Sequence, residues 1–470
     1  MAVSESPVSQ SAAVAAAPPA GTPASLPPSS PALLTDRYEL TMLAAALADG
    51  TADRQCTFEV FARRLPDGRR YGVMAGIPRF LQRLEHFRFE DEELAAVSAF
   101  LDPPTVSWLA DYRFGGEIDG YREGELYFPG SPVLTVRGSF AECVLLETLA
   151  LSILNHDSAI ASAAARMVTA AGSRPIIEMG SRRTHEEAAV AAARAAYLAG
   201  LAATSNLEAG RRYGVPTAGT SAHAFTLLHA AGDPQAAAAG ELAAFRAQVA
   251  SLGAETTLLV DTYDITTGVE NAVAAAGTEL GGVRIDSGDL GVLARQVRAQ
   301  LDDLGATSTR IVVSGDLDEY AIAALRAEPV DTYGVGTALV TGSGAPTAGM
   351  VYKLVEVDGV PVTKRASHKE SRGGTKYAYR AAKPSGTIVE EIISAIEHPE
   401  PQAIPETGGL TVTALQHPLV RGGNLVADQP DLTAARDHLR AALVSLPWEG
   451  LGLSHGDPAI PTRFLSGGGR

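Results

Sequence analysis

The segment Gly281–Leu290 combines residue types that could carry out chemistry. Arg284 lies within a strand-like alternation of apolar residues. Asp286 and Asp289 follow and flank a Ser-Gly turn, and the residues from Gly291 onward are typical of a helix. Burying an arginine beside two carboxylates is costly unless they pair with one another or bind a ligand. Arg284 suits a planar carboxylate or a phosphate, and the aspartates suit ribose hydroxyls or a hydrated Mg²⁺. A surface arginine–aspartate pair that caps a helix is the simpler alternative.

The segment Gly219–Phe225 contains a histidine in a comparable setting. His223 stands four residues after the glycine of a Gly-Thr turn. A single histidine is more often a hydrogen-bonded core residue than a catalyst. Thr220 is most simply explained as a helix N-cap. The pattern alone therefore leaves a catalytic and a structural interpretation open.

Other polar or glycine-containing segments allow two interpretations as well. Arg182 and Arg183 could be a solvated pair at a helix start, but the helix dipole disfavours cations there unless an anion joins them. Gly315 and Gly336 permit close approach of the backbone to a phosphate, although each could simply serve its turn. Tyr38 is, on the pattern alone, a packing residue.

The length and composition are those of a multidomain soluble enzyme. A chain of 470 residues is too long for one ordinary domain, so we expect two. The formal net charge of −16 argues against nucleic acid and anionic membranes as main partners. No apolar stretch avoids glycine and charge well enough to span a bilayer. Cys56 and Cys143 are the only cysteines, which fits a reducing compartment, so we expect a cytoplasmic protein.

The two ends of the chain predict one mixed α/β domain. Residues 1–31 are mostly Ala, Pro and Ser and predict a disordered tail. Residues 32–140 contain a predicted helix at Leu34–Ala48, a strand at Thr57–Phe61 and further short elements. Residues 351–470 contain a predicted strand at Val351–Val357, other strands and a late helix. We expect the second segment to return to the first.

Residues 141–350 alternate strand candidates with Ala-rich helical stretches, which implies a parallel sheet with right-handed crossovers. Almost every strand candidate ends in polar residues. A barrel collects such groups from all strands, whereas an open sheet concentrates them at one switch point. The pattern therefore predicts an irregular (β/α) barrel that carries the site. Its seven strand candidates begin at Pro175, Ala199, Val215, Thr257, Val283, Arg310 and Asp331.

Several catalytic motifs are absent from the sequence. There is no G-x-x-x-x-G-K-[ST] phosphate loop and no H-E-x-x-H metal motif. All five lysines lie at or after Lys353, so the predicted barrel strands carry no Schiff-base lysine of the aldolase kind. This excludes a large class of barrel enzymes.

Eight short segments together carry a family resemblance over nearly the whole chain from Leu33. They are Leu33–Tyr38, Phe58–Phe61, Glu178–Arg183, Thr204–Asn206, Gly219–His223, Val260–Asp264, Arg284–Asp289 and Gly334–Thr337. Each motif is weak alone, but eight in this order are highly specific. The sequence resembles the nicotinate phosphoribosyltransferases, which are type II phosphoribosyltransferases.

The resemblance implies an activity, a fold and several site residues. The family joins nicotinate to 5-phosphoribosyl 1-pyrophosphate, giving nicotinate mononucleotide and pyrophosphate, with ATP hydrolysis driving the reaction. The implied fold is an irregular α/β barrel with a second α/β domain. By this similarity His223 is the residue that ATP phosphorylates. Tyr38, Thr220 and Arg284 match positions that hold nicotinate, and Thr337 matches one that holds the phosphoribosyl donor.

The reaction so implied suggests further roles. Displacing pyrophosphate builds positive charge on the ribose and negative charge on the leaving group, which Mg²⁺ and arginines such as Arg182 would offset. Asp286 and Asp289 could hold the ribose hydroxyls or a metal through bound water, and Asp261 could stabilise the cationic ring. The 5′-phosphate would lie against backbone N–H groups in the loops that carry Ser314, Gly315, Gly336 and Thr337.

The resemblance also implies Mg²⁺ as cofactor, ATP as co-substrate and a homodimer with shared active sites. Tyr38 precedes the predicted barrel by about 100 residues, so its helix could reach a partner's barrel mouth more readily than its own. Two rival functions remain open. One is a relative that uses nicotinamide or quinolinate, and the other is a non-catalytic barrel that binds phosphorylated metabolites.

Overall fold

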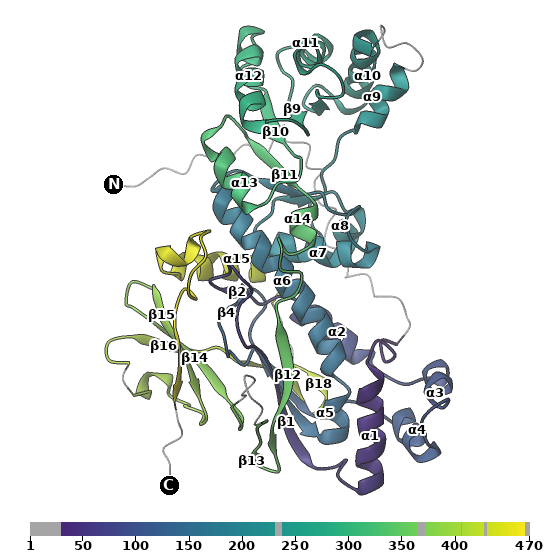
Figure 1. Cartoon of the computed structure of the whole chain (residues 1–470), viewed down its shortest axis with the longest axis vertical. Coiled ribbons are helices and arrows are strands. Elements are labelled where there is room, and N and C mark those ends of the chain that lie inside the picture. Colours follow the sequence, from purple (N-terminus) through teal and green to yellow (C-terminus); the bar gives the residue numbers. More distant parts are fainter. Residues whose placement is uncertain (1–29, 231–236, 365–371, 406, 427–429, 466–470) are drawn as a thin grey trace. The chain divides into compact units, whose positions relative to one another are not determined.

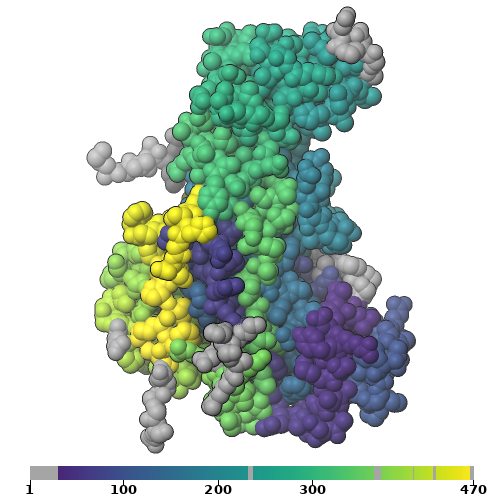
Figure 2. Space-filling model, in the orientation of Figure 1, coloured from purple at the N-terminus to yellow at the C-terminus, as the bar shows by residue number. Residues whose placement is uncertain are grey.

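The fold is that of a computed structural model, in which residues 30–230, 237–364, 372–405, 407–426 and 430–465 are described. The predicted tail, residues 1–31, lies outside the described residues except for its last two. The chain divides into two compact units. We call residues 163–344 the half-barrel unit. The other described residues, 30–162 and 345–465, form the split unit, which combines the purple-to-blue and the light-green-to-yellow segments (Figure 1, Figure 2).

Six parallel strands form a curled sheet in the half-barrel unit (Figure 1). Their order is β7-β6-β11-β10-β9-β8, so β11, the last strand of this sheet along the chain, pairs with β6, the first. The sheet is open between its two edge strands, β7 and β8. The strands are β6 (Ile176–Glu178), β7 (Ala203–Thr204), β8 (Thr257–Leu259), β9 (Gly282–Ile285), β10 (Arg310–Val313) and β11 (Thr332–Val335).

The predicted barrel is therefore present only as a half-barrel. The strand predicted from Val215 is reduced to one bridge between Thr217 and Thr204, and no pair among the described residues joins it to β8. Pro216 explains part of this, because proline has no N–H to donate to a neighbouring strand. The strand predicted from Ala199 begins only at Ala203, because Gly200 adopts a left-handed φ of 118° after the preceding helix.

Helices follow the strands of the half-barrel, and several begin with a polar cap at the strand end. Asn206, Asp264 and Asp289 each accept a backbone N–H in the first turn of the next helix. These caps fix the loops that carry the polar residues. The helices are α7 (Glu186–Leu198), α8 (Leu207–Tyr213), α9 (His223–His229), α10 (Ala237–Leu252), α11 (Ile265–Ala276), α12 (Leu290–Asp303), α13 (Glu319–Ala324), η2 (Leu325–Ala327) and α14 (Thr337–Val340).

The split unit contains three sheets built from both ends of the chain. In the seven-stranded sheet the N-terminal β1 pairs with the C-terminal β12, which confirms the predicted return of the chain. The strands of this sheet are β13 (Val360–Pro361), β12 (Met350–Val357), β1 (Gln55–Ala62), β5 (Leu134–Ser139), β3 (Glu117–Gly120), β17 (His417–Arg421) and β18 (Asn424–Leu425). The four-stranded sheet has β16 (Thr411–Ala414), β14 (Tyr377–Ala382), β15 (Ile388–Ser394) and β19 (Thr462–Leu465), and the two-stranded sheet has β2 (Gly72–Val73) and β4 (Leu126–Tyr127).

The helices of the split unit largely match the predicted ones. The first helix starts at Arg37 rather than Leu34, because residues 32–35 form turns. Two successive helices, α5 and α6, follow β5, and α6 begins in the split unit and ends in the half-barrel unit. They are α1 (Arg37–Asp49), α2 (Ile77–Glu85), α3 (Asp91–Val97), α4 (Pro103–Ala110), α5 (Phe140–Val144), α6 (Glu147–Ala171), η3 (Pro401–Ala403), α15 (Leu432–Ser445) and η4 (Trp448–Leu451).

Within the described residues, the helical stretch Phe140–Ala171 has the length and composition that could cross a membrane. In that stretch 67% of the most apolar window is buried inside the protein. A buried core helix passes the same test, so this composition is weak evidence for a membrane span.

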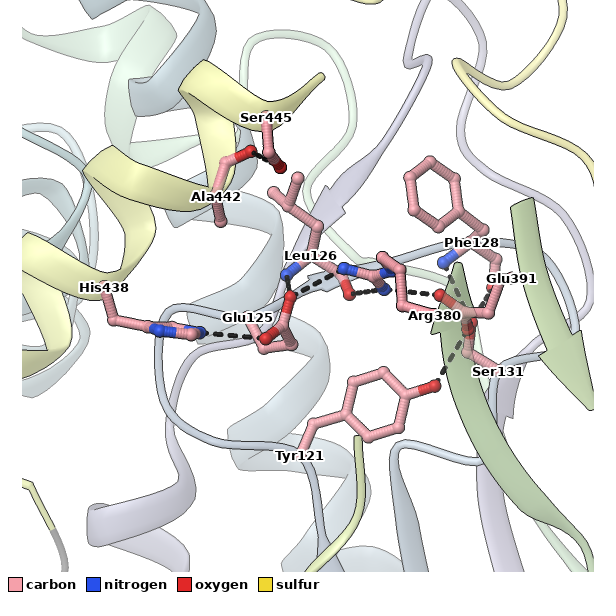
Figure 3. A network of polar contacts seen from close by, with 10 residues as sticks. All are labelled: Tyr121, Glu125, Leu126, Phe128, Ser131, Arg380, Glu391, His438, Ala442 and Ser445. Atoms are coloured by element: carbon pink, nitrogen blue, oxygen red, sulfur yellow. Dashed lines mark hydrogen bonds and ion pairs between the residues drawn. The ribbon is translucent and has the colours of Figure 1, made fainter. Parts of the chain in front are cut away.

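A buried network of charges connects the sheets of the split unit (Figure 3). Arg380 on β14 donates to Glu125 at 2.7 Å and forms an ion pair with Glu391 on β15. Tyr121 donates to Glu391 at 2.8 Å, and His438 on α15 bonds the second oxygen of Glu125 at 2.8 Å. Burial alone would raise the pKa of Glu125, but Arg380 and His438 outweigh it and lower the pKa to about 2. Arg380 is thus the cation shared by two buried carboxylates.

We expect Arg380→Met to reduce the free energy of unfolding by about 3–5 kcal/mol, because it removes the cation that pairs with the fully buried Glu391 and one of the two partners of Glu125. Arg54→Met is the matched control, since the Arg54–Asp358 pair is about half exposed and its loss should change the free energy of unfolding little. Urea denaturation of both variants measures the difference. Equal losses would contradict a central role for Arg380.

The pKa of Glu125 also predicts how this stabilisation depends on pH. Its folded pKa lies below its ordinary value of 4.5, so its contribution is present above pH 4.5 and is lost as the pH falls toward 2.

Candidate active site

A cavity of about 550 Å³ occupies the inside of the curled sheet. Each of the six strands lines it with one residue, as expected when alternate side chains face the same side of a strand. Arg284 is the only charged residue of these six. The six lining residues are Ile177, Ala203, Thr257, Arg284, Val312 and Thr332. The cavity thus places one guanidinium group among apolar and hydroxyl side chains.

Arg284 is held in place by residues at the ends of its own strand and the next. Its Nε donates to Ser314 Oγ at 2.7 Å, and its Nη2 donates to Asp286 Oδ1 at 2.6 Å. Its Nη1 makes no hydrogen bond with any residue that the structure describes. The arginine–aspartate pair that would explain these residues without a ligand is therefore present. The same arginine nevertheless lines the cavity, where its Nη1 can still donate.

Asp286 connects Arg284 to the neighbouring loops. Its Oδ1 also accepts a hydrogen bond from Ser314. Burial would raise the pKa of Asp286, but the Ser314 hydrogen bond and the Arg284 charge together lower it, with a smaller contribution from His223. Asp286 is therefore ionised at neutral pH, and His223 lies close enough to affect it.

Asp261 holds the loop that follows β9. Its Oδ2 accepts the backbone N–H of Asp286 and the hydroxyl of Ser287, both at 2.8 Å. Its Oδ1 is buried and has no hydrogen-bond partner among the described residues. Gly315 permits the neighbouring loop to approach, because a Cβ there would lie 2.4 Å from the carbonyl oxygen of Asp286, and its φ is 116°. The ends of β8, β9 and β10 are thus packed into one rigid edge.

His223 begins α9, and its Nδ1 is 3.0 Å from the Thr262 hydroxyl. Thr262 follows Asp261 at the end of β8. The contact leaves Nε2 as the ring nitrogen that is free for chemistry. Sequence reasoning assigned no role to Thr262, although it lies inside one of the family-like segments.

Thr220 and Arg182 both line the rim of the cavity. The helix-cap explanation of Thr220 is wrong, because α9 starts at His223 and its N-cap residue is Ala222. Arg182 and Arg183 are exposed and lie in a turn before α7, whose N-cap is His185, rather than at the helix start itself. Arg182 has no ion-pair partner among the described residues, which suits a site for an anionic ligand.

The remaining predicted residues of the half-barrel unit lie at loop ends. Asp289 is exposed and caps α12 through its Oδ1, which accepts the Val292 N–H at 3.1 Å. Gly336 precedes the short helix α14, and Thr337 is its exposed first residue. None of these three lines the cavity described above.

Tyr38 belongs to the split unit, where 44% of its surface is exposed. Partial burial and the neighbouring Glu147 carboxylate raise the pKa of its phenol. The hydroxyl therefore stays protonated at neutral pH. Its own unit therefore covers this side chain only in part.

The described residues contain no group of three or more His, Cys, Asp or Glu side chains arranged to hold a metal ion. Asp286 and Asp289 each have one carboxylate oxygen that makes no hydrogen bond with described residues. Two such oxygens at one strand end fit a hydrated Mg²⁺ held through its water ligands better than a direct protein cage.

Two family models match the sequence of this chain. The nicotinate phosphoribosyltransferase (NAPRTase) N-terminal domain matches residues 33–155, and the nicotinate phosphoribosyltransferase (NAPRTase) family matches residues 175–385. Nicotinate phosphoribosyltransferase pncB1 of Mycobacterium tuberculosis (strain ATCC 25618 / H37Rv) is 68% identical over 434 residues, covering 92% of this chain and 95% of that protein. The human nicotinate phosphoribosyltransferase is 33% identical over 433 residues, covering 79% of this chain and 80% of that protein.

Solved structures are similar over most of the chain. The crystal structure of human nicotinic acid phosphoribosyltransferase has a TM-score of 0.77 at 29% identity, covering 92% of this chain and 97% of that one. The crystal structure of nicotinate-nucleotide pyrophosphorylase from Pyrococcus furiosus has a TM-score of 0.72 at 24% identity, covering 88% of this chain and 95% of that one. The second likeness concerns the fold alone.

Proposed function

This chain belongs to the nicotinate phosphoribosyltransferase family, and from that premise we propose that it makes nicotinate mononucleotide and pyrophosphate from nicotinate and 5-phosphoribosyl 1-pyrophosphate in NAD biosynthesis. We propose further that ATP hydrolysis drives the reaction through a phosphorylated His223. The observation that carries the proposal is Arg284, the one charged residue that the six strands turn into the cavity, whose Nη1 makes no hydrogen bond with the described residues.

Arg284 would select the acid form of the pyridine. A carboxylate on the pyridine ring can accept charge-assisted hydrogen bonds from the free Nη1 of Arg284. The Thr220 hydroxyl at the rim can donate a further bond. The apolar and hydroxyl side chains of the lumen suit a flat, uncharged ring.

The phosphoribosyl donor would lie across the strand ends. Arg182, which has no ion pair with the residues that the structure describes, supplies a positive charge for the phosphates. The loop of Ser314 and Gly315 and the start of α14 at Gly336 and Thr337 present backbone groups that suit the 5′-phosphate.

The carboxylates at the strand ends support the charge changes of the reaction. As pyrophosphate leaves, the ribose ring gains positive charge, which the buried, unpartnered Oδ1 of Asp261 can stabilise. Asp286 and Asp289 would hold the ribose hydroxyls or the waters of Mg²⁺. A bound Mg²⁺ would neutralise charge on the leaving pyrophosphate.

His223 suits a phosphoryl acceptor because an imidazole forms a labile phosphoramidate. Thr262 fixes the ring through Nδ1, so Nε2 is the nitrogen that would receive the phosphoryl group of ATP.

Substrate competition tests the proposed function against its rivals. Purified protein would be given the phosphoribosyl donor with nicotinate, nicotinamide and quinolinate together, and the mononucleotides separated. We expect nicotinate to be consumed first. Preferred use of nicotinamide or quinolinate, or donor binding without turnover of any pyridine, would contradict the proposal.

We also propose a homodimer in the cytoplasm, with Tyr38 of one subunit stacked on the pyridine ring in the other. Stacking would contribute about 0.5–1.5 kcal/mol beyond burial of the ring. The Tyr38→Ala and Arg284→Ala variants should each have weak activity alone. When the two are unfolded and refolded together, up to about a quarter of the active sites should be of wild-type composition, because one site of each mixed dimer is intact. If heterodimers demonstrably form but the activity of the mixture is only the mean of the activities of the two parent variants, Tyr38 serves its own subunit.

A further inference from the structure

Glu178 is a buried carboxylate that the proposed chemistry does not use. It ends β6, and 1% of its surface is exposed. One oxygen, Oε1, accepts the backbone N–H of Gly180, and the other, Oε2, accepts the hydroxyl of Thr204 at 2.5 Å. Both partners donate, so the position suits an acceptor-only carboxylate. Burial nevertheless raises the pKa of Glu178, which shows that the group is kept in an unfavourable environment.

Thr204 extends this connection into the loop after β7. Its Oγ1 accepts the N–H of Asn206 at 2.9 Å, and Asn206 Nδ2 donates to Ser181 Oγ at 3.0 Å. The N–H of Ser205 donates to the carbonyl oxygen of Glu178 at 2.8 Å. These hydrogen bonds form a closed set that begins and ends at the loop after β6. The two loops are therefore fixed against each other.

The loop after β6 carries Arg182 at the rim of the cavity. The N–H of Arg183 donates to the Gly180 carbonyl at 2.8 Å and closes the turn in which Arg182 lies. A Cβ on Gly180 would lie 2.3 Å from Val340 Cγ1 and 3.0 Å from Glu178 Oε1, so the turn is packed directly against the carboxylate. Arg182 itself has no ion pair with the described residues, and its place depends on this turn.

We propose that Glu178 is a positioning residue that holds the Arg182 turn against the β7 loop and so fixes Arg182 for the anionic phosphoribosyl donor. The inference rests on the proposed function and adds a residue that touches no substrate. It predicts a selective defect, because Arg284, the proposed contact of nicotinate, lies on β9, which is three strands away from β6 in the sheet.

The direct test is steady-state kinetics of Glu178→Ala and Glu178→Gln. Alanine leaves the Gly180 N–H and the Thr204 hydroxyl without their acceptor, and we expect KM for the donor to rise about tenfold or more, with smaller changes in kcat and in KM for nicotinate. Glutamine retains one oxygen for the Gly180 N–H, so its effect should be intermediate. Calorimetry of donor binding in the absence of nicotinate should rank the variants in the same way, with the wild type tightest, Glu178→Gln intermediate and Glu178→Ala weakest.

Glu123→Gln is the matched control. Glu123 is 2% exposed and also accepts backbone N–H groups, those of Gly76 and Ile77, but it lies in the split unit. Its replacement should lower the melting temperature without changing KM for the donor. A general loss of stability would change KM for the donor alike in the Glu123 and Glu178 variants, whereas a positioning role changes it only in the Glu178 variants.

A double-mutant cycle shows whether Glu178 acts through Arg182. If it does, the donor KM of the variant with both Glu178→Ala and Arg182→Ala should be close to that of Arg182→Ala alone. Additive effects would overturn the inference, as would an unchanged donor KM in folded Glu178 variants. If Glu178→Ala does not fold, Thr204→Val removes the second partner of the carboxylate and decides the question by the same kinetic measurements.

Product formation by the wild type separates failure of this inference from failure of the proposed function, because a wild type without product refutes the proposed function itself.

Discussion

Replacing His223 with alanine is expected to abolish ATP hydrolysis while leaving slow, uncoupled formation of nicotinate mononucleotide. The donor and nicotinate would be bound by other residues, among them Arg284, so the chemistry of transfer remains possible without the phosphoryl acceptor. Wild-type protein incubated with ATP should carry an acid-labile phosphate, and His223→Ala should carry none. Labelling with ATP followed by acid treatment measures both.

His229→Ala is the matched control, because His229 ends the same helix and its Nδ1 bonds only the Phe225 carbonyl within that helix. This variant should keep both the phosphate and the ATP hydrolysis. Thr262→Val should weaken phosphorylation without removing it, since it frees the imidazole ring to rotate. An acid-labile phosphate still present on His223→Ala would refute the assignment.

Arg284→Gln is expected to weaken nicotinate binding by one to two decades. A charge-assisted hydrogen bond contributes about 1.5–3 kcal/mol, and each 1.4 kcal/mol corresponds to a factor of ten. The donor should be much less affected, because its phosphates would rely on Arg182. Separate KM values for the two substrates measure this difference.

Arg182→Gln provides the reciprocal control for Arg284→Gln. This variant should weaken binding of the donor and leave binding of nicotinate nearly unchanged. Arg284 also pairs with Asp286 and Ser314, so a purely structural role is the alternative. Equal losses for both substrates in Arg284→Gln would favour that alternative.

The sequence was most informative where a local pattern determines the structure. The alternation around Arg284 and the Ser-Gly turn before Asp289 predicted a strand, a loop and a helix, and β9 and α12 lie there. The return of the C-terminal segment to the N-terminal domain was also predicted from recognisable strands in both segments, although the pairing of β1 with β12 itself was not.

Prediction was poorest where the outcome depends on backbone detail or on distant partners. The strand expected at Val215 is interrupted by Pro216, and the cap expected at Thr220 lies too far before the true start of α9. The contact of Glu178 with Thr204 joins residues 26 apart, and that of His223 with Thr262 joins residues 39 apart. No local pattern specifies which hydroxyl such a side chain will meet, because the loops between them set the distance.

The most direct measurement is formation of nicotinate mononucleotide from nicotinate and 5-phosphoribosyl 1-pyrophosphate, with and without ATP, followed together with ADP release. We expect product in both cases, with faster and more complete conversion when ATP is present, and ADP formed in step with product. The absence of nicotinate mononucleotide under either condition would contradict the proposed function. The same rate and yield with and without ATP would contradict the phosphohistidine mechanism.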